Sequence, residues 1–290
     1  MRYSDTCVGW ALAHQVIGGL KPTLRQLRLL VLALALVLVA APARAAEPVK
    51  TTAVQNIGGI ADAKDAGTIT GIVLFKGDKP EARPIVDIAG NAYCQEQHKV
   101  KLPVRDTFVF GKNQGNDTLA NVLVYVSAGL ESKEFDPPKT PAVLDQVGCM
   151  YTPHVVAVMS RQTLQIRNSD ATLHNIMSSP RDNPSFNFGM PSQGATNDIV
   201  FTLPEMKINI KCFMHPWMSG YIHVLEHPFF AVTGPDGAFT IQGLPPGQYE
   251  ISVLHEASLL QATPPKATVT VAAGQKQDVQ FTYQIKPADR

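Results

Sequence analysis

From Thr68 onward the sequence is a succession of short runs rich in β-branched and aromatic residues. The runs are TITGIVLF, TFVF, NVLVYV, VVAV, TLQIRN, DIVFTL, INIKCF, YIHVL, AFTI, YEISVL, ATVTV and VQFTY. Between them stand segments such as GDKP, GKNQGND, SPRDNP, GPDG and LPPG, whose Gly, Pro, Asn and Asp residues supply turn geometry. Regularly spaced short strands predict an all-β chain built from antiparallel sandwiches.

The composition agrees with a folded β protein. Hydrophobic residues make up 45% of the chain, charged residues 17%, and the formal net charge is +1. These values exclude a nucleic-acid-binding domain, a disordered chain and a collagen-like one. The 290 residues allow one large domain or two smaller ones of about 100 to 200 residues each.

Residues 1–45 have the layout of a secretory signal peptide. A basic stretch, KPTLRQLR, precedes the apolar run LLVLALALVLVAA, and Ala43 and Ala45 form a small-residue cleavage pattern before Ala46. The alternative is a membrane anchor, but this run is shorter than the roughly 20 residues needed to cross a bilayer. We therefore expect export, a periplasmic location and no membrane span in the mature protein, which would begin with a flexible linker over residues 46–66.

Removal of the leader changes the charge and the cysteine count. It takes away five basic residues and one acidic residue, which leaves 20 basic against 23 acidic residues and a net charge of −3. Cys7 also leaves, so the mature chain keeps Cys94, Cys149 and Cys212. In an oxidising compartment Cys94 and Cys149 can form a bridge, a pairing that sequence alone leaves open.

The C-terminal part contains the hairpin TGPDGAFTIQGLPPGQY, in which Asp236-Gly237 predicts a tight turn and Phe239 and Ile241 alternate toward a core. This pattern resembles the second half of the carboxypeptidase regulatory-like, or transthyretin-like, sandwich. The resemblance implies that residues 67–141 form the first part of that sandwich and residues 227–290 the second part. Residues 142–226 would then be a separate domain inserted into it, a hypothesis that requires the strands near 68–75 and 238–254 to share a sheet.

The proposed insert contains the motif KCFMHPWMSGY, with Cys212, His215 and Met218 inside seven residues. His174, in the upstream segment NSDATLHNIM, supplies a second imidazole. A thiolate and two imidazoles in a trigonal plane, with a thioether as a weak axial ligand, are the donors of a type 1 copper site. The sequence therefore predicts one copper ion held by His174, Cys212, His215 and Met218.

At these residues the segment 142–226 resembles the cupredoxins, and within them the amicyanin-type blue copper proteins, whose compact ligand loop has the pattern C-x-x-H-P-aromatic-M. The resemblance implies a Greek-key β-sandwich with Cys212 as the strong thiolate ligand and Met218 as the axial one. It also implies that Asn175 steadies the ligand loops and bonds toward the sulfur. Trp217 stands where such proteins often have Phe. The whole chain further resembles exported methylamine-utilisation-like proteins.

Other chemistry fits the sequence less well. Zinc prefers several thiolates or a carboxylate and gains little from a thioether, so copper is favoured. No C-x-x-C-H haem motif, nucleophile elbow or phosphate-binding glycine loop is present in the sequence. The remaining histidines lack ligand spacing joined to a third soft group. Because the four donors leave no position for a substrate, we expect no enzymatic activity.

The sequence thus predicts a protein that passes single electrons between redox partners such as a c-type cytochrome or a periplasmic dehydrogenase. Phe213, Met214 and Trp217 surround His215, and we expect an apolar docking surface around that imidazole edge. The alternative is a module that stores or senses copper, or a structural interaction module, without a dedicated role in electron transfer.

Overall fold

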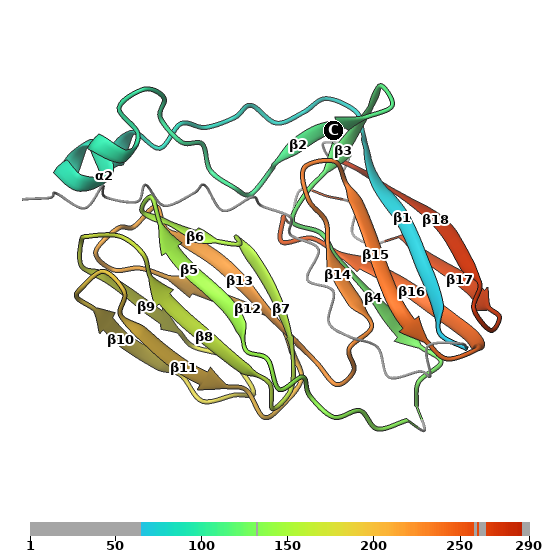
Figure 1. The fold of residues 1–290 in the computed structure, drawn as a ribbon. Helices are drawn as coiled ribbons and strands as arrows, with labels where there is room; N and C mark the ends of the chain where they lie inside the picture. The colour runs from blue at the N-terminus through green and yellow to red at the C-terminus, as the bar shows by residue number, and fades with distance from the viewer. Residues whose placement is uncertain (1–64, 132, 258–259, 261–264, 286–290) are drawn as a thin grey trace, which may run out of the picture. The chain divides into compact units, whose positions relative to one another are not determined.

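The computed structural model describes residues 65–131, 133–257, 260 and 265–285 (Figure 1). The predicted signal peptide and most of the predicted linker lie outside these residues. All described residues belong to one compact unit, Thr51–Arg290. The predicted all-β class is confirmed, since the regular secondary structure of the described residues is β-strand apart from one 3₁₀ turn and one six-residue helix.

Strands from both ends of the described chain form the first sandwich. One sheet contains β1 (Gly67–Lys76), β2 (Phe110–Asn113), β3 (Asn116–Leu119), β15 (Ala238–Leu244) and β18 (Lys276–Gln284). The other contains β4 (Leu123–Ala128), β14 (Phe230–Val232), β16 (Gly247–Leu254) and β17 (Lys266–Val271). β1 pairs antiparallel with β15 and parallel with β18. The β1–β15 pairing is the one that the insertion hypothesis requires.

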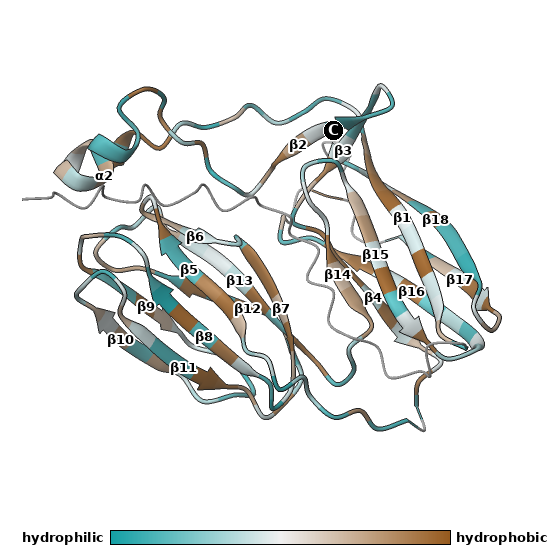
Figure 2. Cartoon of the chain, viewed as in Figure 1, coloured by the Kyte–Doolittle hydropathy of each residue, from teal (hydrophilic) through white to brown (hydrophobic). Residues whose placement is uncertain are grey.

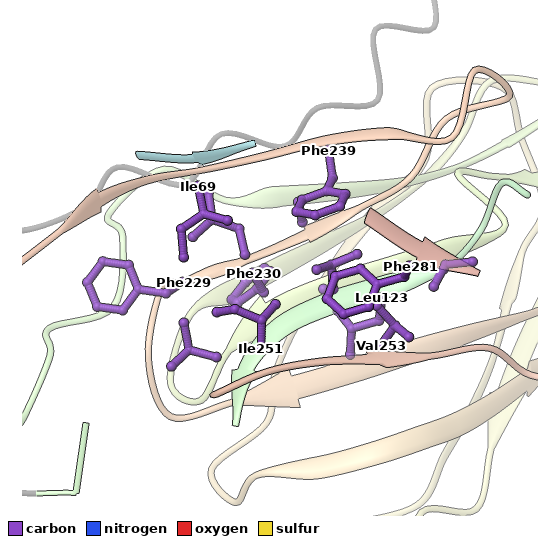
Figure 3. Close-up of a cluster of buried hydrophobic side chains, with 14 of the residues drawn as sticks. Ile69, Leu123, Phe229, Phe230, Phe239, Ile251, Val253 and Phe281 are labelled. Carbon is purple, nitrogen blue, oxygen red and sulfur yellow. The ribbon is translucent and has the colours of Figure 1, made fainter. Parts of the chain in front are cut away.

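Alternating apolar residues of these strands fill the core of the first sandwich. Phe239 and Ile241 are almost fully buried, as the hairpin pattern predicts, and they join Ile69 and Phe281 in one cluster (Figure 3). Gly237 has a φ of +70° at the turn, and a Cβ there would come within 2.6 Å of a backbone oxygen of β1. The tight turn therefore requires glycine at this position.

Strands between β4 and β14 form the second sandwich. One sheet has the order β10-β9-β12-β13-β7, with β7 (Val155–Met159), β9 (His174–Ser178), β10 (Phe186–Met190), β12 (Glu205–Lys211) and β13 (Ser219–Leu225). The other has the order β11-β8-β5-β6, with β5 (Ala142–Val147), β6 (Met150–Thr152), β8 (Thr163–Asn168) and β11 (Thr196–Val200). Figure 2 shows the hydrophobic colouring of β7, whose five residues are all buried.

Both sandwiches contain mixed sheets, although the sheet of β4, β14, β16 and β17 is purely antiparallel. β13 pairs parallel with β7, and β5 pairs parallel with β8. Parallel neighbours need crossover connections, which the chain makes by passing from one sheet of the sandwich to the other. Sequence periodicity identifies the strands but does not distinguish these pairing directions.

The connection between β1 and β2 packs against the second sandwich. It contains the 3₁₀ turn η1 (Val86–Gly90) and the helix α2 (Ala92–Gln97), and its buried Ile85, Ile88 and Cys94 belong to the core cluster of residues 142–224. Cys94 forms a disulfide with Cys149, with the two Cα atoms 5.7 Å apart. The bridge that sequence left open is thus confirmed. The disulfide fixes the connection between β1 and β2 to the second sandwich, although the sequence assigned this connection to the first.

Cys149 lies in an unusual backbone position. It forms with Gly148 the two-residue loop between β5 and β6, and both residues have positive φ values, of 56° and 61°. That left-handed pair is the geometry of a type I′ hairpin, which disfavours side chains with a Cβ. The position must therefore be held by interactions outside the hairpin.

No helix among the residues that the structure describes is long and apolar enough to span a bilayer.

A buried carboxylate organises the turn before β10. The Glu205 side chain accepts hydrogen bonds from the backbone N–H groups of Arg181, Asp182 and Asn183 and from the amide of Asn183, at 2.6 to 3.2 Å. Burial by itself would raise the pKa of Glu205, but these donors lower it below the usual glutamate value. The ionised form of Glu205 therefore stabilises the folded state.

We expect Glu205→Gln to lower the free energy of unfolding by about 1–3 kcal/mol near neutral pH, because the charge-assisted hydrogen bonds are lost. A depressed folded pKa contributes stability that is present above the unfolded value and lost as pH falls through the folded one. The difference between variant and wild type, measured by urea unfolding, should therefore shrink at acidic pH. Glu226→Gln, at an exposed glutamate, serves as the control. A pH-independent difference would contradict this account.

Candidate metal centre

Three of the four predicted ligands converge at one end of the second sandwich. His174 begins β9, Cys212 follows β12, and His215 lies in the loop that leads to β13. The Nδ1 atoms of His174 and His215 are 2.9 Å apart, and Cys212 Sγ lies 3.8 Å from His215 Nδ1. One donor atom from each residue lies within 4.8 Å of the others, and all three residues are buried. A metal ion held here would therefore be bound through Nδ1 of both rings.

Two backbone hydrogen bonds close the ligand loop. Cys212 N–H donates to the Met218 carbonyl at 3.2 Å, and Met218 N–H donates to the His215 carbonyl at 2.8 Å. Met218, the predicted axial ligand, is fully buried and belongs to the same apolar cluster as Cys212. The short spacing of the motif thus folds into a compact turn that holds the two strand ends together.

The environment of Cys212 favours its thiolate. Burial would raise the pKa of this thiol, but hydrogen bonds from His174, from His215 and from the backbone N–H of Asn175 lower it to about 6. Asn175 also accepts a hydrogen bond from Phe213 N–H through its side-chain oxygen, at 3.1 Å. Asn175 therefore contacts the ligand loop and the sulfur, as the sequence resemblance implies. Cys212 is also the free cysteine of the described residues.

Asp170 links the ligands to the disulfide. Its carboxylate accepts hydrogen bonds from His174 Nε2 at 2.8 Å, from Gly148 N at 2.8 Å and from Cys149 N at 2.7 Å. The Tyr93 hydroxyl of α2 donates to it at 3.2 Å. Burial opposes ionisation of Asp170, yet the hydrogen bonds from His174, Cys149 N–H and Gly148 N–H hold its pKa below the usual value. This carboxylate accepts from both N–H groups of the left-handed turn at Cys149. It also orients His174 with Nδ1 toward Cys212.

His215 is covered, which contradicts the expectation of an exposed imidazole edge. It is 1% exposed, and its Nε2 lies 3.0 Å from the side-chain nitrogen of Asn91, the residue that caps α2. Trp217 is also buried, and its indole N–H donates to the Cys149 carbonyl at 3.0 Å. Of the predicted apolar rim, Phe213 and Met214 are exposed, at 64% and 53%.

Asp170 and Asn91 contact the predicted ligands, although neither was among the predicted site residues. Asp170 lies four residues before His174 in NSDATLHN, and a carboxylate so close to a ligand histidine is a signal that could have been read. Asn91 is 124 residues away from His215, and only the disulfide partner Cys94, three residues further along, points to its location.

The donor set fits a soft metal ion. A low-pKa thiolate and two imidazole Nδ1 atoms face one another in a water-poor environment, and a thioether residue is buried in the same loop. Thiolate, imidazole and thioether together favour copper over zinc, which gains little from a thioether.

Comparisons with known proteins give structural neighbours alone. No protein-family model and no curated protein matches this chain. The Cu-containing nitrite reductase NirK from Thermus scotoductus SA-01 is 26% identical, with a TM-score of 0.27 over 35% of this chain, and the match spans 25% of that protein. A purple cupredoxin from Nitrosopumilus maritimus is 22% identical over 29% of this chain and 98% of its own, with a TM-score of 0.24.

A Cu(I) form of an amicyanin variant is 18% identical over 35% of this chain and 97% of its own, with a TM-score of 0.27. Each of these three matches covers about a third of this chain.

The Asp170 carboxylate provides a test of the site. We expect Asp170→Asn to weaken Cu(I) binding by about 10- to 100-fold, because the amide cannot accept from all of His174, Gly148 and Cys149. Chelator competition measures the affinity. Asp198→Asn on the exposed strand β11 is the matched control and should bind as wild type. Equal Cu(I) affinities in the two variants would show that Asp170 does not support metal binding.

Proposed function

We propose that residues 142–226 form a type 1 copper domain that transfers single electrons between redox proteins. The carrying observation is the convergence of Cys212 Sγ with Nδ1 of His174 and of His215 in a buried site. When bound, copper supplies a one-electron couple between Cu(I) and Cu(II). The four residues that would hold it are His174, Cys212, His215 and Met218.

The protein's own residues supply a rigid frame for this chemistry. The Cys212–Met218 loop is closed by its two backbone hydrogen bonds, and His174 is fixed by Asp170. Asn175 N–H bonds the sulfur and lowers the electron density that the thiolate offers. Ligands held in this way need little rearrangement when an electron arrives or leaves. The four donors leave no position for a substrate, so the proposal assigns no enzymatic reaction.

A second candidate is a module that stores or senses copper. The observation that favours it is the cover on His215, whose outer nitrogen contacts Asn91 rather than solvent. A storage or sensing role predicts readily exchanged metal and weak colour, whereas electron transfer predicts retained metal and reversible cycling.

The proposal extends to the rest of the chain. We infer export through a signal peptide in residues 1–45 and a periplasmic location, where a c-type cytochrome or a dehydrogenase would exchange electrons with the site. The first sandwich would be a carboxypeptidase regulatory-like scaffold of the kind found in methylamine-utilisation-like proteins. The pairing of β1 with β15 and β18 supports this proposal. It joins strands that precede the second sandwich in the sequence to strands that follow it.

The proposal is tested by loading the disulfide-intact protein with Cu(II). We expect an intense visible absorption from thiolate-to-copper charge transfer and a reversible one-electron wave in voltammetry. Cys212→Ser should lose the absorption, because a hydroxyl cannot replace the thiolate. A colourless wild-type protein with tightly bound copper would contradict the proposal.

The two methionines of the ligand loop provide a matched pair. Met218→Leu should shift the reduction potential, because the axial donor tunes it. Met214→Leu, four residues earlier and 53% exposed, should leave the potential unchanged. Voltammetry of both variants distinguishes a thioether ligand from a general effect of losing a sulfur near the loop.

A further inference from the structure

Three segments of the chain meet at His154, which is outside the predicted ligand set. His154 lies between β6 and β7 of the second sandwich, and its side chain is 7% exposed. Its Nε2 lies 2.8 Å from the buried carboxylate of Glu256, two residues after β16 of the first sandwich. Its Nδ1 lies 4.0 Å from Asp106 Oδ2, in the connection between β1 and β2. One imidazole thus links both sandwiches and the connection.

The two carboxylates favour one protonation state of this ring. A neutral imidazole carries one N–H and one lone pair, whereas the protonated ring donates from both nitrogens. Nδ1 of His154 is buried and has no hydrogen-bond partner among the described residues. If Nε2 donates to Glu256, a neutral ring turns the lone pair of Nδ1 toward the carboxylate of Asp106. The protonated ring suits both neighbours, through a hydrogen bond to Glu256 and an ion pair with Asp106.

The surroundings of His154 favour the same state. Burial alone would lower its pKa, but the hydrogen bond to Glu256, the charges of Glu256 and Asp106 and the Ser219 carbonyl raise it above the ordinary histidine value. Burial and the charge of Glu256 also raise the pKa of Asp106, although His154 lowers it. Both shifts mean that the folded cluster binds a proton more readily than the unfolded chain does.

The other ionisable groups around the cluster do not change charge near neutral pH. The Tyr221 ring lies edge-on to His154 with 6.3 Å between ring centres, and burial raises the pKa of its hydroxyl. His255 is buried, and burial lowers its pKa to about 4. Lys207 donates to the backbone carbonyl of Glu256 at 3.4 Å. His154 is therefore the group of this cluster whose charge responds to pH near neutrality.

We propose that His154 is a proton-operated tie between the two sandwiches: the protonated ring holds Glu256 and Asp106, and loss of its proton as pH rises weakens the joint. The deprotonated ring keeps a neutral hydrogen bond to Glu256 and loses its ion pair with Asp106. The tie adjusts the strength of a joint that apolar contacts maintain, because the core of the first sandwich includes three residues of the second, Ala157, Met159 and Leu225.

The direction of the pH effect follows from the shift at His154. A folded pKa above the unfolded one contributes stability that is fully present below about pH 6.5 and is lost as pH rises through the folded pKa. The tie is therefore strong at mildly acidic pH and weak at alkaline pH, which is opposite to the effect expected at Glu205. No predicted metal ligand takes part, so the tie does not depend on the proposed function.

The test is a double-mutant cycle with His154→Gln and Glu256→Gln on the full, disulfide-intact protein. Urea unfolding gives the unfolding equilibrium constant of the wild type, of both single variants and of the double variant. We expect a coupling of about tenfold or more in that constant at about pH 6, and of about threefold or less at about pH 9, where the ring has lost its charge. Glu226→Gln, at an exposed glutamate, replaces Glu256→Gln in the control cycle and should show no coupling to His154 at either pH.

A nuclear magnetic resonance titration of the imidazole provides a second measurement, which requires only the wild-type protein to fold. The His154 resonance, assigned by its absence in His154→Gln, should titrate with a midpoint above the ordinary value of about 6.5. Asp106→Asn should lower that midpoint, because it removes one of the two negative charges.

Each outcome decides the proposal. Coupling that is present at the lower pH and declines at the higher one, with a raised titration midpoint, supports the tie. Equal coupling at both pH values, or none at either, would overturn it. If the variants do not fold, a wild-type midpoint at or below the ordinary histidine value for every histidine resonance would overturn it as well.

Discussion

The hydrogen bonds of the buried Asp170 carboxylate hold together the parts of this molecule that matter for its chemistry. One carboxylate accepts from His174, a predicted ligand, from the two N–H groups of the left-handed loop at Cys149, and from the hydroxyl of Tyr93. Leaving buried donors of this kind unpaired costs about 1–3 kcal/mol each. The hairpin, the disulfide and the orientation of His174 are therefore coupled through a single side chain.

A continuous line of contacts extends this coupling across the centre. It runs from Asp170 to His174, from His174 to His215, and from His215 to Asn91, the residue that caps α2. The disulfide closes the line, since Cys149 bonds Asp170 and Cys94 bonds Asn91. His174 and His215 each have one nitrogen facing the other predicted donors and one facing an outer partner. Such outer partners determine which ring nitrogen is free to bind metal.

The strands and the compact turn over Cys212–Met218 were largely predictable, because both depend on local sequence. Alternation of apolar residues locates β1, β15 and β16, and the spacing of Cys212, His215 and Met218 identifies the ligand loop. The packing of η1 and α2 against the second sandwich was not predictable, because α2 has six residues and too few turns to show a helical period. The burial of His215 was not predictable either. It depends on Asn91, which reaches the site through tertiary contacts alone.

A copper X-ray absorption spectrum of the copper-loaded protein tests the central claim most directly. The structure leads us to expect one short sulfur contact from Cys212 and two imidazole nitrogens, with the sulfur signal lost in Cys212→Ser. Copper surrounded only by nitrogen and oxygen in the wild-type protein would show that the ion binds elsewhere, and would contradict the assignment of the centre.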